Sequence, residues 1–208
     1  MTRANRLLPA ACLATALTLA LAPAAQAKPT KAPGGDVARG ALLVQVGGCN
    51  HCHTPWGFDA NLGMPVPDMK RMLSGHPAGS PDPEGKPGKR DIALIGPTFT
   101  SFAMPFGIVY APNLTPDKDT GLGSWTEKMF VDAIRTGKHL GGNGRAILPP
   151  MPWMDLRALP DPDLKAIFAF LQSIPAVKNP VRQWVCESVH YIQRHPGAGD
   201  ARECPGRV

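Results

Sequence analysis

Two cysteines and a histidine stand together in the run Cys49-Asn50-His51-Cys52-His53. Two thiols separated by two residues on one turn can each add to a vinyl group of a porphyrin. The histidine that follows lies on the same turn, and its imidazole can bind the central iron. The spacing therefore predicts one covalently attached c-type haem, held by Cys49 and Cys52, with His53 as the proximal iron ligand.

A Cys-x-x-Cys pair also occurs in zinc sites and in thioredoxin-like redox motifs. Zinc sites usually take four ligands, often from a second pair, and the remaining cysteines after residue 27, Cys186 and Cys204, are too far apart to form one. The redox motif requires a βαβ context, whereas the approach from Asp36 to Gly48 has a helical pattern. Haem attachment is therefore the favoured interpretation.

A low-spin haem iron takes a second axial ligand, most often a methionine sulfur beside a histidine in a protein of this kind. Met151 is the predicted distal ligand, because it lies in Leu148-Pro149-Pro150-Met151-Pro152-Trp153. Three prolines fix φ in this loop and so limit its rearrangement. Core packing is the usual role of a single methionine, and an open sixth position is also possible. The alternative ligands are Met154, Met104, His76 and His139.

Three segments have the pattern of helices that would position these residues. The first runs from Asp36, a plausible N-cap, to Val46. The second runs from Trp125 to Thr136, opens on a Ser-x-x-Glu capping box at residues 124–127 and ends before Gly137. The third runs from Pro162 to Ser173, with Asp161 as N-cap and Pro162 at the first helical position.

No strand pattern competes with these helices, so the sequence predicts an all-α fold. The first and last helices would cross, with Gly40 facing Phe168 or Phe170. The middle and last helices would flank the loop that carries Met151. Residues 36–180 would form the domain, with a proline-rich loop insertion at about residues 54–110. The insertion contains a basic stretch from Lys86 to Arg90, which is either a docking patch or a solvated loop.

The first 27 residues have the features of a secretory signal that is removed. Arg3 and Arg6 precede a short apolar run, and Ala25-Gln26-Ala27 fits a small-x-small cleavage site; an uncleaved anchor is the alternative. Residues 28–35 would be a linker. Export agrees with the motif, because bacterial c-type haem is attached outside the cytoplasm. The expected location is therefore the periplasm, with no membrane-spanning segment in the mature chain.

An oxidising compartment permits disulfides. Cys12 would be lost with the signal, and Cys186 and Cys204 are the two cysteines left over. A bridge between them is predicted to hold a C-terminal extension at residues 181–208, with two free thiols as the alternative. The formal net charge of +6 includes Arg3 and Arg6 of the signal. This mild basic balance, without basic runs interleaved with aromatics, does not indicate nucleic-acid binding.

Taken together, the motifs resemble the single-haem class I cytochrome c family, in particular the cytochrome c subunits of proteobacterial periplasmic dehydrogenases. The similarity covers most of residues 36–180. Besides the Cys-x-x-Cys-His motif with Thr54 and Pro55, it is carried by Ala111-Pro112-Asn113-Leu114-Thr115-Pro116-Asp117, Thr120-Gly121-Leu122-Gly123-Ser124-Trp125-Thr126, Arg135-Thr136-Gly137, the Met151 loop and Asp163-Leu164-Lys165-Ala166-Ile167-Phe168-Ala169-Phe170-Leu171.

The resemblance implies the class I cytochrome c fold and electron transfer without substrate turnover, so the chain is expected not to be an enzyme. It would accept an electron from a periplasmic dehydrogenase and pass it to another cytochrome or an oxidase. Two alternatives stay open. One is a haem enzyme, or a gas- or peroxide-reactive cytochrome, with an open or labile sixth position. The other is a subunit that relays electrons within a fixed complex.

Overall fold

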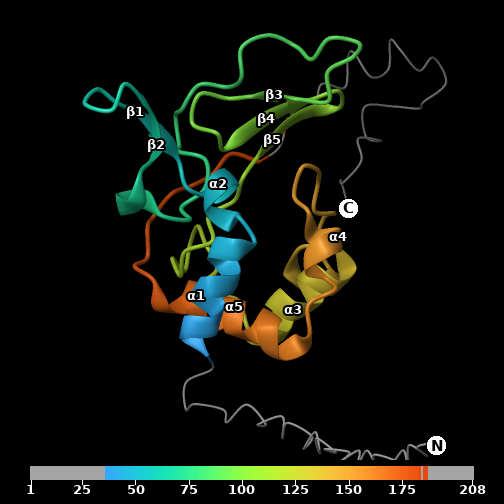
Figure 1. Cartoon of the computed structure of the whole chain (residues 1–208). Helices are drawn as coiled ribbons and strands as arrows, with labels where there is room; N and C mark the ends of the chain where they lie inside the picture. Colours follow the sequence, from blue (N-terminus) through green and yellow to red (C-terminus); the bar gives the residue numbers. More distant parts are fainter. Residues whose placement is uncertain (1–35, 184, 187–208) are drawn as a thin grey trace, which may run out of the picture. The chain divides into compact units, whose positions relative to one another are not determined.

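The computed structural model describes residues 36–183 and 185–186 (Figure 1). The signal and linker predicted for residues 1–35 lie outside the described residues. Within the described part of the chain there are five α-helices and two short 3-10 helices. The α-helices are α1 (Val37–Val46), α2 (Cys49–His53), α3 (Glu127–Thr136), α4 (Trp153–Leu156) and α5 (Asp161–Ser173), and the 3-10 helices are η1 (Met69–Arg71) and η2 (Leu140–Gly142).

Helices α1 and α5, the first and last of the three predicted helices, pack against each other (Figure 1). Gly40 lies at this crossing, where an added Cβ would meet the carbonyl oxygen of Ala166 at 2.0 Å and Cβ of Phe170 at 2.8 Å. Phe168 points elsewhere, because its ring lies 5.4 Å from that of Phe130 on α3. Of the two predicted neighbours of Gly40, Phe170 is therefore the one that lies against it.

Two helices, α3 and α5, start at residues other than those predicted. Helix α3 begins two residues later than the capping box implies: Thr126 is the N-cap, and its hydroxyl accepts from the N–H of Met129 at 3.2 Å. Asp161 is not the N-cap of α5 but its first residue. Its carboxylate instead accepts a hydrogen bond from Arg135 at 2.5 Å.

The all-α prediction is wrong for the insertion at residues 54–110, which contains antiparallel strands. These are β1 (Trp56–Asp59), β2 (Met64–Pro67), β3 (Leu94–Ile95), β4 (Ser101–Met104) and β5 (Gly107–Tyr110). Strands β1 and β2 form a hairpin, and β3, β4 and β5 form a sheet that β6 (Val185–Cys186) joins beside β5. Strands of two to four residues show too few alternations to be seen as a period, and Pro65 and Pro67 further obscure β2.

The apolar core lies among α1, α3 and α5. It contains Val44, Leu122, Phe130, Val131, Ile134, Leu164, Ile167, Phe168, Leu171 and Ile174. Leu73 from the insertion joins this core and is completely buried. The insertion is therefore packed into the domain, and it is not a decoration on its surface.

Between residues 36 and 183, no helix is both long and apolar enough to cross a membrane. The predicted disulfide involves Cys204, which lies outside the described residues. Its partner Cys186 is described only by its backbone, which pairs with Gly107 in the sheet.

Candidate haem-attachment site

Helix α2 places Cys49, Cys52 and His53 on one turn. Gly47 and Gly48 separate it from α1, and Gly48 has the left-handed φ of 68° that turns the chain between the two helices. Residues at positions i, i+3 and i+4 of a helix project from the same face. The two thiols and the imidazole therefore share one side of α2, as attachment to a single ring system requires.

The His53 imidazole is held by a loop 59 residues away in sequence. Its Nδ1 lies 2.9 Å from the carbonyl oxygen of Pro112. Because a carbonyl can only accept, Nδ1 must carry the ring proton, and Nε2 keeps its lone pair. Nε2 has no hydrogen-bond partner among the described residues. Burial lowers the pKa of His53, against a smaller upward effect of the Pro112 bond, so the ring offers a neutral nitrogen.

The thiols of Cys49 and Cys52 are partly buried and are not bonded to each other. Burial raises the pKa of both thiols, and the proximity of Cys52 raises that of Cys49 further. Both groups are therefore protonated at neutral pH. A protonated thiol is the species whose S–H adds across a vinyl C=C bond, with the sulfur bonding to one carbon and hydrogen to the other.

Thr54, whose side chain is buried, holds the end of α2 in place. Its buried hydroxyl donates to Oδ1 of Asn50 at 2.8 Å and accepts from the N–H of Leu73 at 2.9 Å. One side chain thus connects the attachment turn with the insertion. The contact satisfies a buried backbone donor that would otherwise cost about 1–3 kcal/mol.

The loop that carries Met151 is anchored at both sides to Gly137, the residue that ends α3. The N–H of Ile147, just before the loop, donates to the carbonyl of Gly137 at 2.7 Å. Trp153, just after it, lies against the same glycine, where an added Cβ would be 2.4 Å from the indole. Met151 is partly buried, and the bond between Pro149 and Pro150 is cis. The loop is thus short and held at both ends.

The other candidate ligands lie in different surroundings. Met154 is on α4 with 63 % of its surface exposed. His76 is completely buried, and its Nδ1 lies 3.0 Å from the hydroxyl of Thr100. His139 packs edge-on against Trp125, and burial lowers its pKa to about 4, with a contribution from Arg145.

Met104 is buried in strand β4 and borders an open hollow of about 510 Å³. Pro150 of the Met151 loop lines the same hollow, together with Arg90 and the residues that follow it. The structure therefore brings one alternative ligand and one end of the basic stretch Lys86–Arg90 close to the Met151 loop. The basic side chains of this stretch are exposed.

Several residues of this site were not assigned a role from the sequence. Pro112 acts through its carbonyl, which every residue has, so no side-chain pattern indicates it. Asn113 and Thr115 lie in a recognised motif, but only the fold shows that the Asn113 Oδ1 accepts from both the N–H and the hydroxyl of Thr115, at 2.9 and 2.8 Å. No local sequence pattern indicates a role for Asn179 or Gly75, because the groups that they contact are distant in sequence.

Comparison with known proteins agrees with this site, although no protein-family model matches the chain. The chain is 30 % identical over 145 residues to a nicotinate dehydrogenase subunit of Pseudomonas putida, covering 70 % of this chain and 9 % of that protein. It is 38 % identical over 68 residues to the gluconate 2-dehydrogenase cytochrome c subunit of Pantoea cypripedii, covering 33 % and 15 %. A diheme cytochrome c-type protein of Cereibacter sphaeroides is 25 % identical over 141 residues, covering 68 % and 37 %.

Two of these three relatives are named as cytochromes c, so the chain is similar to proteins of this class. More narrowly, the chain is similar to the cytochrome c subunits of dehydrogenases, as the motifs predict. The chain spans between 9 % and 37 % of the length of the three relatives described above.

Proposed function

We propose that this protein is a periplasmic one-electron carrier with a single covalently bound haem c. Cys49 and Cys52 would hold the porphyrin, and His53 and Met151 would be the axial iron ligands. The bound haem would supply an iron that alternates between the ferrous and ferric states. The observation that carries the proposal is the hydrogen bond from His53 to Pro112, which leaves Nε2 free on the helix face that bears both thiols.

The residues of the chain fit this group. The Pro112 carbonyl selects the tautomer and raises the basicity of the free nitrogen, as a partner of a metal-bound histidine does. Burial keeps the His53 ring neutral, which an iron ligand must be. Within the proposed cytochrome c domain at residues 36–180, α1 and α5 cross beside the attachment turn. This arrangement supports the class I cytochrome c fold.

Met151 is favoured over the alternatives by the way its loop is held. Both ends of the loop return to Gly137, so little conformational entropy is lost when a weak thioether ligand is fixed there. Met154 is largely exposed, and Met104 belongs to a regular strand in the insertion. A closed sixth position suits electron transfer, because an electron carrier neither binds nor converts a substrate at its iron.

The donor would be a dehydrogenase, since several relatives of this chain are cytochrome subunits of dehydrogenases. The acceptor would be another cytochrome or an oxidase. The exposed basic stretch Lys86–Arg90 remains a candidate docking patch, now supported by its position beside the hollow that Pro150 also lines. Rates of reduction by the partner should fall with added salt if this patch steers the encounter.

Ligation is tested by optical spectroscopy of the exported holoprotein. Met151→Ala should abolish the sulfur-to-iron charge-transfer band at the red end of the visible spectrum, whereas Met154→Ala and Met104→Ala should retain it. Cys49→Ala and Cys52→Ala should each lose one thioether, which shifts the pyridine haemochrome spectrum. That assay also counts the haems per chain. Survival of the band in Met151→Ala would show that the distal ligand is wrong.

Carbon monoxide separates the carrier from the reactive-haem alternative. The reduced wild-type protein should bind it slowly or incompletely, because the Met151 sulfur must first leave the iron. Rapid and complete binding by the wild type would favour a haem enzyme or sensor and would contradict the proposal. Met151→Ala provides the positive control, since it opens the sixth position.

A further inference from the structure

The turn around Gly75 in the insertion lies between the proximal histidine and its hydrogen-bond acceptor. The N–H of Gly75 donates to the backbone carbonyl of His53 at 2.8 Å. An added Cβ on Gly75 would lie 2.6 Å from the carbonyl carbon of Pro112, and the φ of 78° is one that glycine adopts without strain. Gly75 therefore touches both residues of the His53–Pro112 bond.

The side chain of Asn179, from the segment after α5, fixes this turn. Its Nδ2 donates to the carbonyls of Ser74 at 2.7 Å and His76 at 2.9 Å, and its Oδ1 accepts from the N–H of Ala78 at 3.0 Å. Ser74 and His76 flank Gly75, so one amide holds the backbone on both sides of the glycine. Asn179 is only 2 % exposed, so water does not compete for these bonds.

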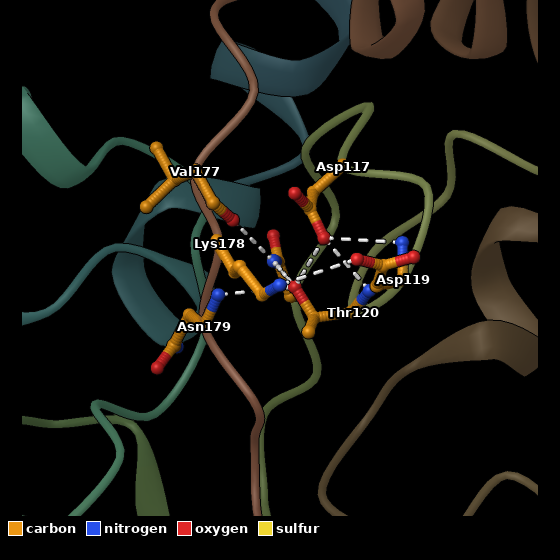
Figure 2. A network of polar contacts seen from close by, with 7 residues as sticks. Asp117, Asp119, Thr120, Val177, Lys178 and Asn179 are labelled. Atoms are coloured by element: carbon orange, nitrogen blue, oxygen red, sulfur yellow. Dashed lines mark hydrogen bonds and ion pairs between the residues drawn. The ribbon is translucent and has the colours of Figure 1, made fainter.

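Figure 2 shows how the backbone of Asn179 is itself anchored. Its N–H donates to the hydroxyl of Thr120 at 3.0 Å, and that hydroxyl donates to Asp117 at 2.6 Å. The same hydroxyl accepts from Nδ2 of Asn113 at 3.1 Å, and Asn113 also donates to the carbonyl of Val177 at 2.8 Å. The residue that follows Pro112 and the residue that holds the Gly75 turn are therefore fixed to one network.

A second set of backbone bonds joins the turn to the Pro112 loop. The N–H of His76 donates to the carbonyl of Ala111 at 2.9 Å, and the N–H of Leu114 donates to the carbonyl of Leu73 at 2.9 Å. These bonds lie on the two sides of Pro112. A displacement of the turn that Asn179 holds would therefore be passed on to the Pro112 loop.

We propose that Asn179 is a positioning residue for the His53 imidazole, because it holds the Gly75 turn against the Pro112 peptide and so keeps that carbonyl in line with Nδ1–H. This inference rests on the proposed function, in which His53 binds the haem iron. A firm bond at Nδ1 makes Nε2 a stronger donor to the iron, which favours the ferric state and lowers the midpoint potential. The insertion thereby contributes to tuning the proximal ligand.

The test uses the exported holoprotein and the variant Asn179→Ala, which removes all three side-chain hydrogen bonds and does not change the net charge. Hydrogen exchange of the His53 Nδ1–H is measured by NMR in the reduced, diamagnetic protein, and the midpoint potential is measured by titration. Exchange should be at least about tenfold faster, which corresponds to about 1.4 kcal/mol in the opening equilibrium. The midpoint potential should rise, because a looser Pro112 bond makes the imidazole a weaker donor.

Val131→Ala is the control for a general loss of stability, because it removes core packing in α3 without touching this network. It should leave both the potential and the exchange of the His53 Nδ1–H close to the wild-type values. If Asn179→Ala does not fold, Asn179→Ser is measured instead. Its shorter hydroxyl can replace at most one of the two donated bonds, and changes of the same sign and smaller size are expected.

The outcomes separate this inference from the proposed function. If Asn179→Ala or Asn179→Ser matches Val131→Ala in both potential and Nδ1–H exchange, Asn179 is only structural and the inference is overturned. If the wild-type protein itself gives no His53 resonance with the large upfield ring-current shifts of a haem ligand, the proposed ligation fails.

Discussion

The Gly40→Ala variant tests the helix crossing that organises the domain. The new Cβ would lie 2.0 Å from the carbonyl oxygen of Ala166, whereas Cβ atoms essentially never approach another atom within 3.0 Å, so the helices must separate by at least about 1.0 Å there. The obstacle is backbone, so no side-chain rotation can relieve it. Overpacking of this kind costs about 1–3 kcal/mol, and the value here should be near the upper end.

The same substitution also has a favourable effect, since alanine is a better helix former than glycine by about 1 kcal/mol. The expected net result is a loss of about 2 kcal/mol in the free energy of unfolding. For a domain of this size that corresponds to a fall of about 4–8 °C in Tm.

Guanidinium unfolding of the holoprotein, followed by tryptophan fluorescence, measures this loss. Gly57→Ala is the matched control, because an added Cβ at that position meets nothing within 4 Å. It should be neutral or slightly stabilising. A Gly40→Ala protein as stable as the wild type, or more stable, would refute the close crossing of α1 and α5.

Three further outcomes are expected. His139 has a pKa lowered to about 4 by burial, so between pH 6.5 and 4 the unfolded chain binds a proton that the folded chain does not. Stability should therefore fall as the pH drops through this window, by at most about 3 kcal/mol, and His139→Gln should flatten the profile in urea titrations at each pH. Thr54→Val should cost about 1–3 kcal/mol by leaving the buried N–H of Leu73 unpaired, whereas Thr54→Ser should recover most of the loss in the same denaturation assay. Arg135→Leu should cost about 1–2 kcal/mol, because its half-exposed guanidinium bonds Asp161 and the carbonyl of Leu159, and an unchanged unfolding midpoint would show that these bonds are replaced by water.

The features that could be predicted from the sequence depend on residues close together along the chain. The attachment motif occupies five residues, and its side chains share one helix face because of helical periodicity alone. The helices α1, α3 and α5 lie where apolar spacing and terminal glycine or proline residues place them. The predicted starts were less accurate, because Thr126 rather than Ser124 caps α3, and Asp161 is bound by the distant Arg135 and is the first residue of α5.

There is a physical reason why the strands of the insertion could not be predicted from the sequence. Strand β3 has two residues, as has β6, which joins the same sheet from outside the insertion, and such strands gain stability only by pairing with neighbours already in a sheet. Leu73 likewise shows no periodicity, yet it is completely buried in the core of α1, α3 and α5. Burial of a single side chain in a loop is decided by what surrounds it in space.

By itself, the sequence determined the chemistry that the chain can offer: two thiols and an imidazole on one turn, and a methionine in a stiff loop. Only the tertiary structure decided which nitrogen of His53 is free, because the Pro112 carbonyl that selects the tautomer is 59 residues away. It also decided that Asn179 and Gly75 hold this acceptor in place, through bonds that span more than 100 residues in the case of Asn179. Local sequence specifies turns and helices, whereas the direction of a hydrogen bond to a distant carbonyl depends on how the whole chain packs.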